Sequence, residues 1–299
     1  SLVKNDEDEK GTIKLWQNVR EFLDREFPDA AMVSEWGEPD KSLQGGFHMD
    51  FLLHFGPSHY NDLFRCEEPF FSSRGKGDVS AFVEKYLDNY EKSEKKGLMC
   101  IPSGNHDMGR LSQGIKGDEL KIAFAFLLSM PGAPFIYYGD EIGMKYVEGL
   151  TSVEGGYERT GSRTPMQWKK GKNAGFSDGE KELLYLPVNE NGVNVEEQLG
   201  DENSLLNKVK ELIALRKTTQ ALSASGGIEF LNRKDGGYPL VYKRSSNDEE
   251  YLICINPSNE DKKFEMKLCA DVIMQNGNVK LSEEGIVLGA VSYAILKLK

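Results

Sequence analysis

Residues 30–37 read Ala-Ala-Met-Val-Ser-Glu-Trp-Gly, an apolar, strand-like run that ends abruptly in polar, turn-forming residues. Residues 98–107 repeat this form, since Leu-Met-Cys-Ile is followed by Pro-Ser-Gly-Asn-His-Asp. The two stretches place Glu35 and Asp107 just after the carboxyl ends of two different strands. Enzymes built on a parallel β/α barrel carry their catalytic groups at these strand ends, so the sequence predicts a pair of catalytic carboxylates.

Helical and strand-like patterns alternate along the chain as far as Leu222. Apolar residues at helical spacing predict helices over 15–27, 79–90, 118–130 and 205–213, and strand-like runs occupy 30–33, 46–55, 98–101 and 133–138. Strands that alternate with helices in this rhythm pair in parallel, and four of them are half of an eight-stranded barrel. Residues 145–203 show no strong periodicity, which is typical of a long functional loop.

The pattern changes after residue 222 to short alternating runs separated by Gly, Asn, Asp and Pro. These runs, at 238–242, 251–255, 264–268 and 291–298, predict a small antiparallel domain. The predicted fold class is therefore α/β plus all-β. Residues 1–222 would form part of a (β/α)8 barrel with its long loop at 145–203, and residues 223–299 an antiparallel β-sandwich.

The composition excludes several classes of partner. The chain has 299 residues, 39% of them hydrophobic, and a formal net charge of −11. This charge argues against nucleic acid or an anionic membrane and is compatible with a neutral ligand such as a sugar. No apolar run approaches the ~20 residues of a membrane span. The four cysteines show neither paired nor metal-type spacing. Because the chain opens with Ser1 and not Met, we expect its true start to have been removed, and the compartment is left open.

Glu35 has the surroundings of a proton donor. Glycoside cleavage with retention uses one carboxylic acid to protonate the leaving oxygen and one carboxylate to attack the sugar carbon. The apolar strand before Glu35 and Trp36 after it suit the acid role, because partly desolvated carboxylic acids keep their protons more readily. Trp36 also offers a flat apolar face to a sugar ring. A solvated or salt-bridged loop residue is the alternative interpretation.

Asn105 and His106 put two neutral hydrogen-bonding groups beside the Asp107 carboxylate. Such a set can hold sugar hydroxyls and offset the positive charge of an oxocarbenium-like transition state, although Asp107 could instead cap a following turn. Arg163 could orient a carboxylate or clamp hydroxyls, or could be a surface arginine with a packed stem. The histidine spacing fits no metal site, and no Gly-rich phosphate loop precedes a helix, so we expect neither a metal nor a cofactor.

Together, these residues resemble the α-amylase superfamily of glycoside hydrolases. Residues 33–39 look like the segment that carries the general acid after the fifth barrel strand. Residues 103–107 look like the segment that carries the transition-state-stabilising aspartate after the seventh strand, and residues 132–144 are similar to the eighth strand and its exit. The resemblance covers nearly the whole chain in the family's order and is weakest after Leu222.

Further segments resemble the oligo-1,6-glucosidase, α-glucosidase and trehalose synthase group of that superfamily. They lie at 163–168, 173–177, 186–189 with 194–198, and 204–216. The resemblance implies Glu35 as acid/base and Asp107 as stabiliser. It implies substrate-binding roles for the remaining candidates, which are His106, Arg163, Trp36, Asn105 and Arg110. Of these, Asn105 and Arg110 would support the residues that touch the sugar. The implied ligand is an α-glucoside or an α-glucan oligosaccharide, handled with retention of configuration.

One departure from the family pattern changes the expected activity. The family's nucleophile is an aspartate in a Gly-Phe-Arg-x-Asp type segment at the fourth strand, before the acid, and this chain has no such segment. Arg233-Lys234-Asp235 has the spacing but falls in the predicted C-terminal domain. We therefore expect the C-terminal half of a glycosidase barrel, strands 5–8, cut past its nucleophile and without useful activity by itself.

A half-barrel would expose two strand edges and inward-facing apolar side chains. We therefore expect a missing N-terminal half-barrel as partner, or self-association through these edges. Two other functions stay open: a trehalose synthase-type glucosyl isomerase or transferase with a more closed pocket, and a non-catalytic sugar-binding fragment. The preference for α-1,4 or α-1,6 bonds stays open, because in that family it is linked partly to residues beside the nucleophile, which this chain lacks.

Overall fold

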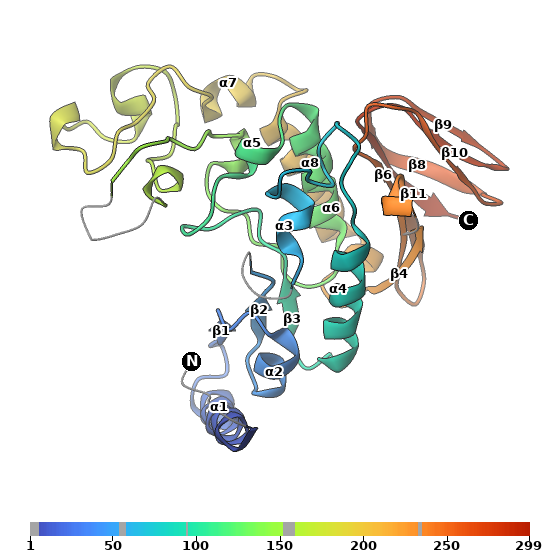
Figure 1. Ribbon diagram of the computed structural model, residues 1–299, viewed down its shortest axis with the longest axis horizontal. Helices are drawn as coiled ribbons and strands as arrows, with labels where there is room; N and C mark the ends of the chain where they lie inside the picture. Colours follow the sequence, from blue (N-terminus) through green and yellow to red (C-terminus); the bar gives the residue numbers. More distant parts are fainter. Residues whose placement is uncertain (1–5, 54–57, 94, 152–158, 233–234) are drawn as a thin grey trace.

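Three short parallel strands form the centre of the chain before residue 222. In the computed structural model, which describes residues 6–53, 58–93, 95–151, 159–232 and 235–299, β1 (Val33–Ser34), β2 (Met49–Phe51) and β3 (Leu98–Cys100) form one sheet in this order. Val33 pairs with Met49, and Met49 pairs with Leu98. The three strands therefore run in the same direction and end at the same edge of the sheet (Figure 1).

The fourth strand predicted at 133–138 is reduced to a single parallel bridge. Phe135 makes only an isolated parallel bridge to Pro102, in the continuation of β3, and no ladder extends from it. Pro134 has no N–H to donate to a ladder, and Gly132 has a φ of 86°, so beyond the bridge the segment adds only the bond from the Ala133 amide to the Met99 carbonyl at 3.3 Å. The strand predicted at 46–55 shortens to β2, and residues 54 and 55 lie outside the described part.

The long helices lie close to their predicted positions. They are α1 (Asp6–Glu26), α4 (Ser80–Lys92), α6 (Asp118–Ser129) and α8 (Leu205–Thr218). Shorter helices occupy the connections: α2 (Pro39–Gln44), α3 (Tyr60–Phe64), α5 (Leu111–Gly114) and α7 (Val195–Leu199). Within the described ranges, none of the helices combines the length and the apolar character needed to cross a lipid bilayer.

Helix α6 joins the parallel sheet region to the C-terminal sheets. Its residues from Ile122 to Ser129 are all buried, as expected for a helix that is apolar on every side. It packs against α8 on one side and against β6 (Glu250–Asn256) and β11 (Ser292–Leu298) on the other. The Ser129 Oγ lies 2.6 Å from the Tyr242 hydroxyl, so a polar contact accompanies the apolar packing.

Two antiparallel sheets form the C-terminal part. The larger contains β4 (Gly227–Asn232), β5 (Leu240–Ser245), β6, β11 and β8 (Ala270–Asn276), and the smaller contains β7 (Lys262–Glu265), β10 (Gly285–Leu288) and β9 (Val279–Ser282). One core cluster, including Val241, Leu252 and Ile286, draws its side chains from both sheets. Alternate residues such as Tyr242 and Ile253 face the core around α6. The predicted antiparallel character is confirmed, with more strands than the four runs indicated.

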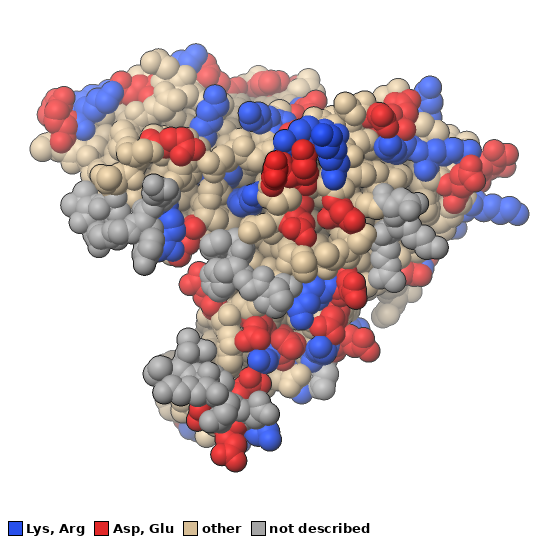
Figure 2. Space-filling model, viewed as in Figure 1, with Lys and Arg blue, Asp and Glu red and all other residues tan. Residues whose placement is uncertain are grey.

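The segment at 145–203 projects from the same end of the molecule as α5 and the start of α8 (Figure 1). Within its described residues it contains only short helical turns and α7, in agreement with the predicted lack of periodicity. Gln167 connects two parts of this segment. Its side-chain amide donates to the Val193 carbonyl, and its backbone carbonyl accepts from the Val195 amide. Figure 2 shows an open hollow between this segment and the α1 end of the molecule.

A buried arginine fixes the C-terminal sheet to α6. Arg244, on β5, is completely buried and donates to the carbonyls of Ser129, Ser223, Gly226 and Gly227. These carbonyls belong to the end of α6 and to the connection into β4. A guanidinium suits this position, because it offers five donors in one plane.

Replacing Arg244→Met should therefore destabilise the protein by about 3 kcal/mol or more, because buried carbonyls left without donors each cost about 1–3 kcal/mol. The free energy of unfolding in urea measures this loss. Lys243→Met is the matched control: Lys243 is the neighbouring residue and pairs with Glu229 and Glu250 at the surface, so its loss should cost less than about 1 kcal/mol. Equal losses for the two variants would contradict the assigned role of Arg244.

Candidate active site

Asp107 is held between two arginines. Its Oδ2 lies 2.7 Å from Arg159 Nη1, and its Oδ1 lies 2.9 Å from Arg163 Nη2. Its backbone amide donates to Asn105 Oδ1 at 2.8 Å, so Asn105 shapes the turn that presents the carboxylate. The side chain of Asp107 keeps 25% of its surface exposed, so the fixed carboxylate stays accessible from solvent.

His106 and Arg163 belong to the same cluster. Arg163 Nε donates to the His106 carbonyl at 2.8 Å, so one guanidinium bonds both the backbone of this loop and the Asp107 carboxylate. His106 Nε2 lies 3.5 Å from Asp107 Oδ1, and the imidazole is 56% exposed. The structure therefore brings together Asn105, His106, Asp107 and Arg163.

A buried carboxylate supports this loop from behind. Asp140 Oδ2 accepts from Ser103 Oγ at 2.8 Å, and the same Oγ accepts from the Tyr137 amide at 2.9 Å. Arg65 donates to the Ser103 carbonyl at 2.6 Å. Burial raises the pKa of Asp140, and the nearby charges of Arg65 and Arg110 act against that rise. These bonds connect the residues after β3 to the turn at 137–140.

Arg110 lies in this supporting layer. Its side chain is completely buried, its Nη1 donates to the Tyr138 carbonyl at 2.5 Å, and the guanidinium lies over the rings of Tyr137 and Tyr138 at 5.3 and 5.0 Å. It is also 3.7 Å from Asp140. The family resemblance implies a substrate-binding role for Arg110, behind the other candidates. In this structure it has no exposed surface with which to contact a ligand.

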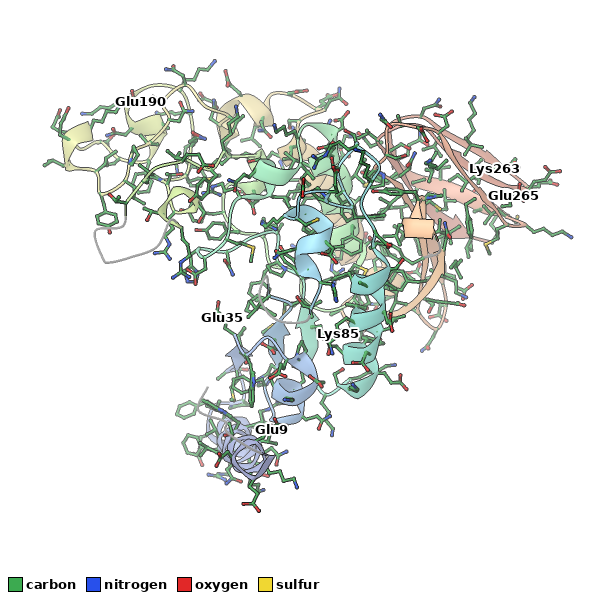
Figure 3. All side chains as sticks on the ribbon, in the orientation of Figure 1. Glu9, Glu35, Lys85, Glu190, Lys263 and Glu265 are labelled. Carbon is green, nitrogen blue, oxygen red and sulfur yellow. The ribbon has the colours of Figure 1, made fainter. Side chains whose placement is uncertain are left out.

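Glu35 and Trp36 follow β1 at the same edge of the sheet. Glu35 is exposed and not partly desolvated as the sequence predicts, and Figure 3 shows its side chain at the end of β1, pointing into the hollow. The Trp36 amide donates to Ser34 Oγ at 3.0 Å and to Asp50 Oδ1 at 3.2 Å. Because one strand, β2, separates β1 from β3, the ends of these two strands are about 10 Å apart. The structure therefore places Glu35 and the Asp107 cluster on one edge, from two different strands.

Three contributors to this region escaped the sequence analysis. Arg159 lies four residues before Arg163, and this spacing of two arginines was the only signal for it. Asp50 interrupts an apolar strand, and Asp140 interrupts the apolar run at 133–144. A charge inside an apolar run is a general sign of a buried, hydrogen-bonded ion.

Among the described residues, no group of three His, Cys, Asp or Glu side chains could hold a metal ion. A groove of about 810 Å³, lined by residues that include Cys66, Arg74, Lys116 and Glu119, contains none of the candidate site residues. The groups with complementary chemistry lie instead in the Asp107 cluster.

Comparisons with known proteins identify the family. A family model described as "Alpha amylase, catalytic domain" matches residues 4–225. Maltase A2 of Drosophila melanogaster is 34% identical over 191 residues, which are 61% of this chain and 32% of that protein. Trehalose synthase/amylase TreS of Mycobacterium tuberculosis is 34% identical over 145 residues, 46% of this chain and 23% of that protein. Among solved structures, the alpha-amylase from H.orenii matches with a TM-score of 0.76 at 18% identity, over 99% of this chain and 58% of that chain.

The chain belongs to the alpha-amylase family, because the family model spans most of its length. The resemblance predicted from the motifs is confirmed, and the fold is that of the alpha-amylase family's barrel proteins with their C-terminal antiparallel sheets. The chain spans less than half the length of these two curated relatives.

The raised pKa of Asp140 gives a test of the supporting layer. A carboxyl group whose pKa is raised by folding contributes stability that is fully present below its unfolded pKa of about 3.9 and is lost as the pH rises through the folded pKa. Asp140→Asn removes this dependence. The melting temperature of wild type should therefore exceed that of Asp140→Asn by the largest margin near pH 4.5, and this margin should shrink toward pH 8.

Asp88→Asn is the control for this series. Lys92 and Lys85 lower the pKa of Asp88, which lies on the exposed face of α4, so this carboxylate is ionised throughout the range. The difference between wild type and this variant should stay flat from pH 5 to pH 8. A wild-type advantage over Asp140→Asn that grows with rising pH would contradict the prediction.

Proposed function

We propose that this chain supplies the acid/base half of an α-glucosidase-type active site, which cleaves α-linked glucosides with retention of configuration. One observation carries the proposal: Glu35 and the cluster of Asp107, His106 and Arg163 follow strands that end at one edge of a parallel sheet. Barrel enzymes assemble their active sites at this edge. The family match over residues 4–225 supports the same reading of the site.

Each group has a role that its surroundings suit. Glu35 is exposed at the end of β1, so its carboxyl group can meet a leaving oxygen and protonate it. Asp107, fixed by its arginines, would offset positive charge on the sugar carbon. The exposed His106 imidazole would bind hydroxyls of that sugar, and Trp36 would border the neighbouring one.

The proposal includes an attacking carboxylate from outside the described site. The sequence has no Gly-Phe-Arg-x-Asp segment before Glu35, and in the alternative at 233–235 the first two residues lie outside the described part. Without a nucleophile the covalent intermediate cannot form, and loss of such a group removes several orders of magnitude in rate. We therefore propose that this polypeptide by itself is catalytically incomplete.

A companion segment would also cover exposed apolar side chains. β1 is an edge strand of its sheet, and Val33 on it is 44% exposed. Phe135, at the other end of the parallel arrangement, is 37% exposed. Unpaired edges of this kind favour association. We propose that the chain forms strands 5–8 of a barrel, over residues 1–222, and that an N-terminal half-barrel or a second copy closes it.

A trehalose synthase-type isomerase is the second candidate. The match to TreS favours it, because it covers 46% of this chain. Both candidates use the same carboxylates, and they differ in whether water reaches the intermediate. Trehalose formation from maltose, measured against glucose release, distinguishes them.

Activity on p-nitrophenyl α-glucoside tests the proposed function. Residues 1–299 alone should release no p-nitrophenol above the buffer rate, whereas the product of the complete gene should hydrolyse the substrate. Glu35→Gln in that product should lower kcat/KM for maltose about 10²- to 10⁴-fold, the usual contribution of a general acid. Glucose release from maltose by residues 1–299 alone that disappears with Glu35→Gln would overturn the proposed incompleteness.

Sedimentation velocity tests the proposed edge association. At micromolar concentration, residues 1–299 should sediment as a dimer or larger species, because Val33 and Phe135 remain exposed in the single chain. Val33→Lys should shift the distribution toward monomer, since a charged residue on an edge strand opposes pairing. A clean monomer for the unmodified chain would argue against self-association.

A further inference from the structure

Asp50 is a buried carboxylate in the middle of β2. Its side chain has no exposed surface, and four donors surround it within the described residues. Ser42 Oγ donates to Oδ2 at 2.7 Å, and the amide of Phe51 donates to Oδ1 at 2.9 Å. The amides of Trp36 and Gly37 donate to the same Oδ1 at 3.2 and 3.4 Å. Burial raises the pKa of Asp50, and hydrogen bonds from Ser42, Gly37, Phe51 and Ser34 act against that rise.

Two of these donors belong to the turn that carries Glu35. Trp36 follows Glu35 directly, and Gly37 has a φ of 78°, in the left-handed region that glycine adopts without strain. The turn then enters α2 at Pro39. Bonds to Asp50 therefore fix the turn to the neighbouring strand, immediately beyond the residue whose side chain points into the hollow.

The short length of β1 makes this attachment important. β1 contains only Val33 and Ser34, so its ladder to β2 ends one residue before Glu35. Beyond that point, backbone pairing no longer determines where the chain goes. The Asp50 carboxylate takes over the role of the backbone hydrogen bonds that are absent there. Its Oδ1 accepts from the two successive amides of Trp36 and Gly37, just after β1.

We propose that Asp50 is a positioning residue for the general acid: it holds the Ser34–Gly37 turn so that Glu35 faces the leaving oxygen. The inference rests on the proposed role of Glu35. Asp50 itself has no exposed surface and acts only through the turn. Its loss should therefore affect protonation of the leaving group and leave the remaining binding contacts in place.

Leaving-group dependence is the readout that separates this role from general support of the fold. An activated leaving group such as p-nitrophenolate departs with little protonation, whereas the sugar oxygen of maltose needs the acid. In the complete gene product, Asp50→Leu should lower kcat/KM for maltose about 10- to 100-fold, the effect of a displacement of about 1 Å. On p-nitrophenyl α-glucoside the same variant should lose less than about 3-fold, because the acid contributes little there.

Conservative and matched variants complete the design. Asp50→Asn keeps the Oδ1 acceptor and can donate to Ser42 Oγ, so it should restore most of the maltose activity. Asp140→Asn is the control, because Asp140 supports the Asp107 loop and its loss should affect both substrates equally. Gly37→Ala disturbs the same turn through its positive φ without touching the core, so it replaces Asp50→Leu if that variant does not fold.

Hydrogen exchange gives a measurement that needs no activity. In residues 1–299, the Trp36 and Gly37 amides should exchange faster in Asp50→Leu than in wild type, and at the wild-type rate in Asp140→Asn. Three outcomes would overturn this inference without touching the proposed acid role. Asp50→Leu could lose kcat/KM equally on both substrates, or it could leave the exchange of the Trp36 and Gly37 amides unchanged. Asp50→Asn could also be as impaired as Asp50→Leu. Equal losses of Glu35→Gln on both substrates would overturn the proposed acid role, and this inference with it.

Discussion

The parallel pairing of β1, β2 and β3 is the constraint on which the candidate site depends, because it decides which loops can meet. Strands paired in this direction all end at one edge of the sheet. The turn after β1 and the loop after β3 therefore approach each other although they are far apart in the sequence. The strand between them supplies Asp50, which bonds to the first of these segments. One short sheet thus positions a candidate acid, a candidate stabiliser and the group that anchors the acid's turn.

The parts of this arrangement that follow from local sequence were predictable. The apolar runs before Glu35 and Asp107 specify strands, and the periodic segments specify α1, α4, α6 and α8. The assignment of Arg163 to the candidate site came from the family resemblance and not from spacing. Asp50 and Asp140 could not be assigned in the same way, because their bonds to Trp36 and Ser103 join segments that are 14 and 37 residues apart. Such bonds depend on the strand order, which a single sequence does not encode locally.

Buried charges mark the places where irregular backbone has to be fixed. Asp50 holds the turn after β1, Asp140 holds the loop after β3, and Arg244 donates to the Ser129 carbonyl at the end of α6. Burying an ion is unfavourable unless hydrogen bonds compensate the lost hydration. Regular helices and strands satisfy their own backbone groups, so this compensation is needed where the ladder or helix stops. These ions therefore lie where regular backbone ends, and two of them, Asp50 and Asp140, support the segments that carry the candidate site residues.

The charge balance of the cluster connects the proposed roles to the proposed companion. Among the described contacts, two guanidinium groups, those of Arg159 and Arg163, bond one carboxylate, that of Asp107. A transition state with oxocarbenium character needs a surplus of negative charge around the sugar carbon. Glu35 does not supply it, since an acid that protonates the leaving oxygen is neutral when the bond begins to break. An attacking carboxylate from a companion segment would form the covalent bond to the sugar carbon and would also supply the negative charge that the cluster lacks. The companion segment that pairs with the exposed strand edge would then also bring the nucleophile to the site.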